Sequence, residues 1–168
     1  MKLLSTSEFA ARPASPYSET GLVTSELLMD GKPTRLIVTG AVMEAALEWQ
    51  GYRIAFLTDD IPFEDMLRIY MFDAKMALVD AAVLGAMYST GRFTKLSLQP
   101  PNTLTFRFFG GAVWRMVLLA KREFCIPVLS DPSGLSRKFQ FFRHFRIDGK
   151  PQPDGVRGIS RHSDIATS

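Results

Sequence analysis

The sequence predicts a mainly β protein, a meander of short antiparallel strands. Two observations indicate this fold class: short segments alternate apolar with polar residues, and tight turn signals separate them. A third is the count of thirteen phenylalanines in 168 residues, because large rings pack well on a half-buried pleated surface. Apolar residues make up 46% of the chain and charged residues 22%, which is ordinary globular composition and excludes a disordered or fibrous protein.

Two turn signals define the first strands. Asp30-Gly31 separates residues 25–28 from residues 35–38, and an Asp-Gly pair between alternating segments is a strong hairpin signal. Gln50-Gly51 ends another alternating segment and leads into the apolar residues 52–57. We therefore expect strands on both sides of each turn.

The second half of the chain continues this pattern. Residues 95–99 alternate between two faces, and residues 104–108 place three large apolar side chains on one face. Gly110-Gly111 reverses the chain into residues 114–119, and the last predicted strand runs over residues 137–147. The spacing is that of a meander with short connections.

Residues 62–88 admit two interpretations. Their Ala and Met content and the apolar spacing are typical of a helix, which would give an α+β fold. Alternatively, residues 67–72 and 78–84 form a hairpin around residues 73–75. We favour the hairpin, because it continues the strand spacing on both sides and the helix would be long against an average of about 11–12 residues.

A meander of roughly eight to ten strands has to close or fold over to protect its edges. We therefore predict a β-barrel or a barrel-like sandwich, calycin-like by analogy of pattern, as a single domain over residues 20–149. Residues 1–19, with Pro13 and Pro16, and residues 150–168 lack an apolar period. They predict a flexible N-terminal arm and a disordered C-terminal tail.

Cysteine content and apolar runs indicate a cytoplasmic protein. Cys125 is the single cysteine, so no intrachain disulfide can form and a disulfide-stapled secreted domain is excluded. The N-terminal residues lack the apolar run of an export signal. Charged residues interrupt every apolar stretch long before the roughly 18 residues of a membrane span, so we expect none.

Charge is unevenly distributed along the chain. Residues 1–90 hold seven Lys and Arg against twelve Asp and Glu, or −5, and residues 91–168 hold thirteen against five, or +8. The basic half could attract nucleic acid, anionic lipid or an acidic protein. Alternatively, the two halves neutralise each other across a closed sheet.

No set of residues predicts catalysis, a metal or a cofactor. The acidic stretch 59–65 holds four carboxylates, which could bind a hard cation or serve a hydrolase or isomerase, but a capped loop explains it without a ligand. His144 is the one candidate base in the folded part, and Cys125 fits a small core residue. The glycines form neither a dinucleotide-binding nor a P-loop signature.

The most distinctive segment is 137–146, where basic and aromatic residues interleave. Such a strand could bind single-stranded nucleic acid, but its rings fit a core equally well, and we expect no nucleic-acid partner. Alternation places Arg143 on the same face as Phe145, and an unpaired guanidinium inside a core would be costly. Either a bulge turns Arg143 outward, or it meets an acid, for which Asp80 is the plausible partner.

These residues support three functional hypotheses. The first is a non-enzymatic barrel that binds an apolar or amphipathic small molecule. Its predicted binding residues are the cavity rings Trp114, Phe106, Phe108, Phe139 and Phe141, with Arg143 and Asp80 at the polar end of the ligand. The second is a protein-interaction module, docking a protein partner or a second copy through exposed apolar residues such as Phe109, Leu119 and Phe142. The third is a hydrolase or isomerase using the loop 59–65.

Overall fold

The computed structural model of the chain describes residues 1–15, 21–61, 64–85, 91–125, 131–137 and 141–150. These residues form antiparallel β-strands and no helix, so the mainly β prediction is confirmed. Within this part of the chain, no helix is long and apolar enough to cross a membrane. The strands in chain order are β1 (Lys2–Leu3), β2 (Phe9–Ser15), β3 (Thr24–Met29), β4 (Lys32–Thr39), β5 (Val42–Trp49), β6 (Tyr52–Thr58), β7 (Leu67–Phe72), β8 (Leu78–Leu84), β9 (Thr94–Gln99), β10 (Thr103–Arg107), β11 (Val113–Phe124), β12 (Leu135–Ser136) and β13 (Phe142–Asp148).

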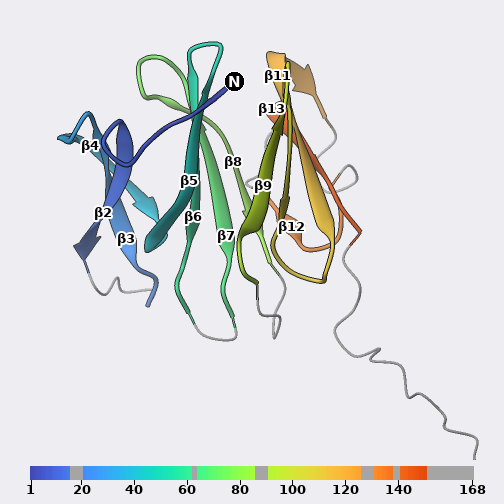
Figure 1. Ribbon diagram of the computed structural model, residues 1–168, viewed down its shortest axis with the longest axis horizontal. Helices are drawn as coiled ribbons and strands as arrows, with labels where there is room; N and C mark the ends of the chain where they lie inside the picture. The colour runs from blue at the N-terminus through green and yellow to red at the C-terminus, as the bar shows by residue number, and fades with distance from the viewer. Residues whose placement is uncertain (16–20, 62–63, 86–90, 126–130, 138–140, 151–168) are drawn as a thin grey trace, which may run out of the picture.

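The described strands form three sheets in three layers. A six-stranded sheet in the order β1-β5-β6-β7-β8-β12 lies between a three-stranded sheet, β2-β3-β4, and a four-stranded sheet, β13-β11-β10-β9. Figure 1 shows these layers side by side, with the N-terminal sheet at the left and the C-terminal sheet at the right. Two hydrophobic cores fill the two spaces between the layers.

The central strand β6 shows how the layers are held together. Ile54 and Phe56 point into the core shared with the four-stranded sheet, whereas Ala55 and Leu57 point into the core shared with the three-stranded sheet. All four side chains are fully buried. Because both faces of β6 are covered, the strand is a continuous apolar run rather than an alternating one.

Aromatic contacts join the six-stranded and four-stranded sheets. The ring centroids of Phe56 and Phe106 are 5.7 Å apart, and those of Phe93 and Phe106 are 5.4 Å apart. At the other side of this core, the indole Nε1 of Trp49 donates a hydrogen bond to the carbonyl of Pro101 at 2.8 Å. The first core is therefore packed by side chains from both sheets.

The predicted hairpin over residues 67–84 is confirmed, and the alternative helix is wrong. β7 pairs antiparallel with β8, with Tyr70 opposite Ala81. Asp73 shapes the connecting turn, because its Oδ1 accepts hydrogen bonds from the backbone N–H groups of Lys75 and Ala77 at 2.8 and 2.9 Å. Residues 62–63 and 86–88 lie outside the described residues.

The predicted closure into one barrel is not found. In the part of the chain that the structure describes, each sheet is open and has two edges. The single sheet does not close because β2, β3 and β4 form a sheet of their own. This sheet packs on the outer face of β5–β7 instead of extending the same meander.

The prediction of a flexible arm over residues 1–19 is wrong for the residues that form β1 and β2. β1 pairs with β5, and β2 pairs with β3. Phe9 is buried in the second core, and its burial supplies the stabilisation that a loose arm would lack. Pro13 is tolerated because β2 is an edge strand. Residues 16–19 and the predicted tail after Lys150 lie outside the described residues.

A small turn holds β1 and β2 together. The carboxylate of Glu8 accepts hydrogen bonds from Lys2 and from the backbone N–H of Ser5, and these contacts lower the pKa of Glu8 to about 2. The turn orients the chain so that Phe9 enters the second core.

We expect Gly149→Ala to destabilise the fold. A Cβ at this position would lie 2.3 Å from Cε3 of the Trp114 ring, which is fully buried in the first core. The cost of such overpacking is about 1–3 kcal/mol in the free energy of unfolding, measured by urea denaturation. Lys150→Ala, at the exposed next residue, should change stability by less than about 0.5 kcal/mol. Equal stability of the two variants would contradict the close packing of Trp114.

Candidate functional site

Arg143 is buried in β13, with 6% of its surface exposed. Arg143, Phe145 and Ile147 share the inward face of the strand, as the alternation predicted. The interpretation that a bulge turns Arg143 into solvent is wrong. The guanidinium meets an acid, but that acid is Asp131: Nη1 and Nη2 donate to Oδ1 and Oδ2 at 2.8 and 2.7 Å.

Asp80, the predicted partner of Arg143, has other partners. Its Oδ1 accepts a hydrogen bond from Nη1 of Arg137 at 2.8 Å. Its Oδ2 accepts from the backbone N–H groups of His144 and Phe145 at 2.7 and 3.3 Å. Asp80 lies on β8 of the six-stranded sheet, and its partners on β13 form the edge of the four-stranded sheet. One carboxylate therefore joins the six-stranded sheet to the edge strand of the four-stranded sheet.

The two ion pairs are connected into one buried cluster. Nε of Arg137 lies 3.5 Å from Oδ1 of Asp131, and Nη2 of Arg137 also donates to the carbonyl of Phe145 at 3.1 Å. The Arg137 guanidinium lies 4.2 Å from the centroid of the Phe145 ring. Burial lowers the pKa of Arg137, and the two aspartates oppose that shift. With two guanidinium and two carboxylate groups, the cluster is neutral.

Sequence reasoning missed both Arg137 and Asp131 in this cluster. Arg137 stands in an interleaved segment whose charged residues fit an outer surface, and Asp131 precedes Pro132 in a segment typical of a turn. The sequence signal for the cluster was in their partners, Asp80 and Arg143. Each is a charged residue in an otherwise apolar face, and so each needs a buried partner of opposite charge.

We expect Asp80→Asn to destabilise the protein strongly. Asn removes the charge that balances Arg137, and breaking a buried ion pair costs about 3–5 kcal/mol in the free energy of unfolding, measured by urea denaturation. Glu26→Gln is the control, since its partner Arg12 is mostly exposed and such pairs contribute about 0–1 kcal/mol. A loss for Asp80→Asn no greater than the control's would show that the cluster does not hold the two sheets together.

The predicted cavity rings belong mainly to the packed core. Trp114, Phe106 and Phe108 are buried in the core between the six-stranded and four-stranded sheets. The Phe109 ring lies 5.1 Å from the Trp114 ring and 6.1 Å from the Phe108 ring. Three hollows lined by described residues contain none of these rings. Phe139 lies outside the described residues.

Phe141 instead belongs to an exposed group of rings, the aromatic patch, formed by Phe124, Phe141 and Phe142. Their exposed fractions are 68%, 50% and 44%. The rings of Phe124 and Phe141 are stacked with an interplanar angle of 5°, and the ring of Phe142 meets that of Phe124 at 78°. The guanidinium of Arg122 lies 4.6 Å from the centroid of the Phe142 ring. Of the apolar residues predicted to be exposed, Phe142 is exposed, whereas Phe109 and Leu119 are buried.

A bulge in β11 places this patch. Leu118 pairs with Phe145 and Glu123 with Arg143, so residues 119–122 lie opposite His144 alone. The extra residues bend β11 away from β13. Phe124 and Phe142 then pair again beyond the bulge, at the end of the sheet.

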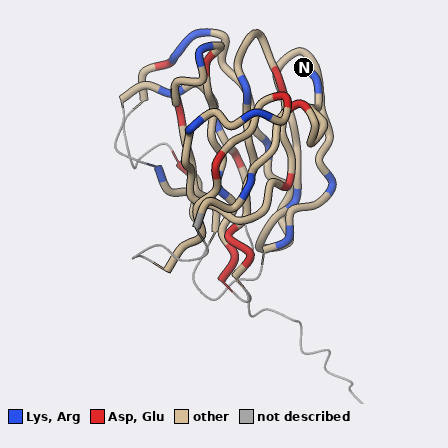
Figure 2. The backbone as a smooth tube through the Cα atoms, turned by 90° about the vertical axis from the view of Figure 1, so that its left-hand side faces the viewer, with Lys and Arg blue, Asp and Glu red and all other residues tan. Residues whose placement is uncertain are grey.

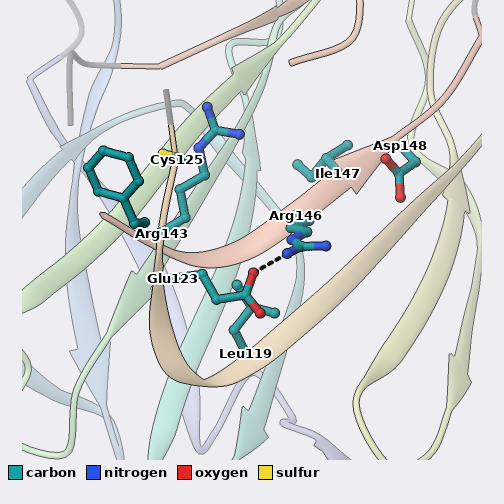
Figure 3. A pocket seen from close by; sticks show the side chains of 8 residues that line it. Leu119, Glu123, Cys125, Arg143, Arg146, Ile147 and Asp148 are labelled. Atoms are coloured by element: carbon teal, nitrogen blue, oxygen red, sulfur yellow. Dashed lines mark hydrogen bonds and ion pairs between the residues drawn. The ribbon is translucent and has the colours of Figure 1, made fainter. Parts of the chain in front are cut away.

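A pocket of about 480 Å³ lies beside the bulge, and we call it the bulge pocket. Arg143 and Cys125 line it together with the ion pair Glu123–Arg146, which Figure 3 shows from close by. The remaining lining residues are Leu119, Phe124, Ile147 and Asp148. Phe124 belongs both to this pocket and to the aromatic patch, so the two are continuous.

The charge asymmetry of the chain coincides with the layers. Residues 91–125 and 141–150, which hold the four-stranded sheet, contain nine Lys and Arg and two Asp and Glu, or +7. Residues 42–61 and 64–85, which hold most of the six-stranded sheet, contain three and eight, or −5. Beside the patch, Lys121, Arg122 and Arg146 are exposed. Figure 2, turned so that the left-hand side of Figure 1 faces the viewer, shows one run of acidic residues at the lower end of the molecule.

The acidic loop 59–65 uses its described carboxylates to hold its own structure. Asp59 accepts hydrogen bonds from Nε and Nη2 of Arg68 at 2.6 and 2.7 Å. Oδ1 of Asp65 accepts from the backbone N–H groups of Asp59 and Asp60 at 2.9 and 3.1 Å. Among the described residues, no group of His, Cys, Asp or Glu is arranged to hold a metal ion.

Asp65 makes the loop sensitive to pH. Burial raises the pKa of Asp65, and the nearby carboxylates of Asp59 and Glu44 raise it further, against the two backbone hydrogen bonds. A pKa raised in the folded state means that this group's contribution to stability is present below its unfolded pKa of about 3.9 and is lost as pH rises through the folded value.

We therefore expect Asp65→Asn to gain stability relative to the wild type as pH rises above about 4. Asn keeps the oxygen acceptor for the two backbone N–H groups and removes the charge. Urea denaturation across a pH series checks this, with Glu64→Gln as the control for loss of a charge in the same loop. A difference in unfolding free energy that stays constant, or falls, as pH rises would contradict the assignment.

Comparison with protein-family models, curated protein sequences and solved structures finds no match to this chain. A functional conclusion therefore depends on the geometry of the described residues. Three features stand out in that geometry: the aromatic patch, the bulge pocket continuous with it, and the excess of cations in the sheet that carries both.

Proposed function

We propose that this chain is a protein-interaction module that binds an acidic segment of a protein partner at the aromatic patch and the bulge pocket. The observation that carries the proposal is the exposure of three phenylalanine rings in mutual contact at the end of one sheet. Large contiguous patches of exposed apolar surface are rare on monomeric proteins, and they mark interaction sites.

The energetics support a partner that covers the rings. Burying a phenylalanine side chain contributes about 1.5–3 kcal/mol, and rings are the typical central contacts of interfaces. The phenylalanine side chain has no polar group that can hydrogen-bond to water. Contact with water therefore does not stabilise the three exposed rings in the free protein. A partner with apolar side chains would recover this free energy at the patch.

Charge supports an acidic partner. Lys121 and Arg122 are exposed beside the rings, and the sheet as a whole carries +7 over residues 91–125 and 141–150. Complementary charge accelerates association and selects partners. A second copy docking through this same face would bring two basic surfaces together, which disfavours the predicted homodimer as the occupant.

The small-molecule hypothesis has less support in its original form. Its cavity rings Trp114, Phe106 and Phe108 pack against neighbouring core side chains, and Arg143 is engaged with Asp131. A calycin-like ligand cavity would require an open interior that these contacts do not favour. A cytoplasmic location agrees with the proposed module, since Cys125 is the single cysteine of the chain and no intrachain disulfide can form.

Fluorescence anisotropy with two labelled peptides tests the proposal. The first peptide alternates Glu with Leu and Phe, and the second replaces every Glu with Lys. We expect saturable binding of the acidic peptide alone, weakening as salt rises because exposed charges are screened.

Phe124→Ser should weaken binding of the acidic peptide about tenfold or more, as expected for a central interface ring. Val113→Ser is the matched control, since Val113 is an exposed apolar residue at the other end of β11, and it should leave the affinity unchanged. Equal affinity of the two variants, or tighter binding of the Lys peptide, would overturn the proposed function.

A further inference from the structure

A second hollow, the β4–β8 groove, lies where the three-stranded sheet stops short of the edge of the six-stranded sheet. Its volume is about 470 Å³, and its lining comes from β4, β7, β8 and β12 and from Arg137. The core beneath the three-stranded sheet contains residues of β5, β6 and β7 and none of β8 among the described residues. Among the described residues, the outer face of β8 therefore lies beside this core rather than beneath the three-stranded sheet, and we call this place the step.

Small and apolar side chains form this step. Ala81 lies opposite Tyr70 on β7, and Val83 lies between Arg68 on β7 and Ser136 on β12. Ile37 and Leu78 also line the groove, yet their exposed fractions are 55% and 52%. Two large apolar side chains from different sheets thus remain exposed at one hollow, where a bound molecule would cover both.

The tyrosine and the two arginines of the groove are engaged within the protein. The hydroxyl of Tyr70 donates to the carbonyl of Thr39 at 2.9 Å. Arg68 donates through Nε and Nη2 to the carboxylate of Asp59. Arg137 donates to Asp80, inside the sandwich of the two larger sheets. Each arginine of the lining is therefore balanced by a carboxylate.

This charge balance decides the class of ligand. A ligand carboxylate or phosphate would have to compete with Asp59 for Arg68, and the carboxylate of Asp65 lies close enough to those of Asp59 and Glu44 to interact with both. Repulsion by these acids disfavours an anion. The exposed hydroxyl of Ser136, which can donate or accept a hydrogen bond, suits one uncharged polar group.

We infer that the β4–β8 groove binds a small uncharged amphiphile. The apolar body of the molecule lies against Ile37, Leu78, Ala81 and Val83, and its hydroxyl or carbonyl group lies at the Ser136 side. The volume falls within the range of about 300–1,000 Å³ typical of small-molecule sites. This site lies on a different sheet from the aromatic patch and does not depend on the proposed peptide binding.

Nuclear magnetic resonance of the full ¹⁵N-labelled chain tests this inference with 1-octanol and octanoate as probes. We expect 1-octanol to shift the amide signals of Ile37, Ala81, Val83 and Ser136 saturably, and octanoate to bind at least tenfold more weakly. The inference is overturned if no saturable shift occurs, if octanoate binds as tightly, or if the shifts fall on Phe124 and Phe142 instead.

Two variants locate the bound probe. Ala81→Phe fills the groove and should weaken 1-octanol binding at least tenfold, whereas Ala74→Phe, at an exposed turn residue, should leave it unchanged. Leu78→Ser changes an exposed side chain, so it keeps the fold even if Ala81→Phe does not, and it should weaken binding severalfold. The inference is overturned if the 1-octanol affinity is unchanged in Leu78→Ser or in a folded Ala81→Phe variant. The peptide assay on the same variants reports separately on the aromatic patch.

Discussion

The carboxylate of Asp80 is the contact on which the arrangement of the two larger sheets depends. It lies on the inner face of β8 and accepts hydrogen bonds from the backbone of β13 and from Arg137. The N–H groups of an edge strand need partners when they are buried. A side-chain acceptor from β8 of the neighbouring sheet satisfies two of them here, and the two sheets are held together without forming a continuous barrel.

The ionic cluster connects Asp80 to a residue that lines the bulge pocket. Arg137 connects Asp80 to Asp131, and Asp131 in turn holds Arg143. Because Arg143 also lines the bulge pocket, the buried cluster and the proposed binding surface share one side chain. A buried network of two guanidinium and two carboxylate groups is costly to break. It therefore holds β13, which carries Phe142 of the aromatic patch, in place.

The three-layer arrangement separates two kinds of surface. Among the described residues, no further layer covers the outer side of the four-stranded sheet, and the residues that hold this sheet carry a net positive charge, whereas the six-stranded sheet is covered and acidic. The aromatic patch lies on the basic layer, and the uncharged groove lies at the step between the other two. The two surfaces differ in chemistry. Exposed cations surround the aromatic patch, whereas carboxylates of the protein already balance the arginines of the β4–β8 groove.

Local sequence was enough to indicate the strands beside the Asp30-Gly31 and Gln50-Gly51 turns, the hairpin over residues 67–84 and the inward face shared by Arg143 and Phe145, because alternation and turn chemistry depend on neighbouring residues. It did not indicate β1 and β2, which depend on pairing with β5 and β3. It did not show which layer covers a face. The aromatic ring of Phe141 fits a core by pattern but lies exposed, and Arg143 pairs with Asp131 rather than with the expected Asp80. Periodicity assigns a side chain to one side of a strand, and what packs against that side depends on contacts between residues far apart in the chain.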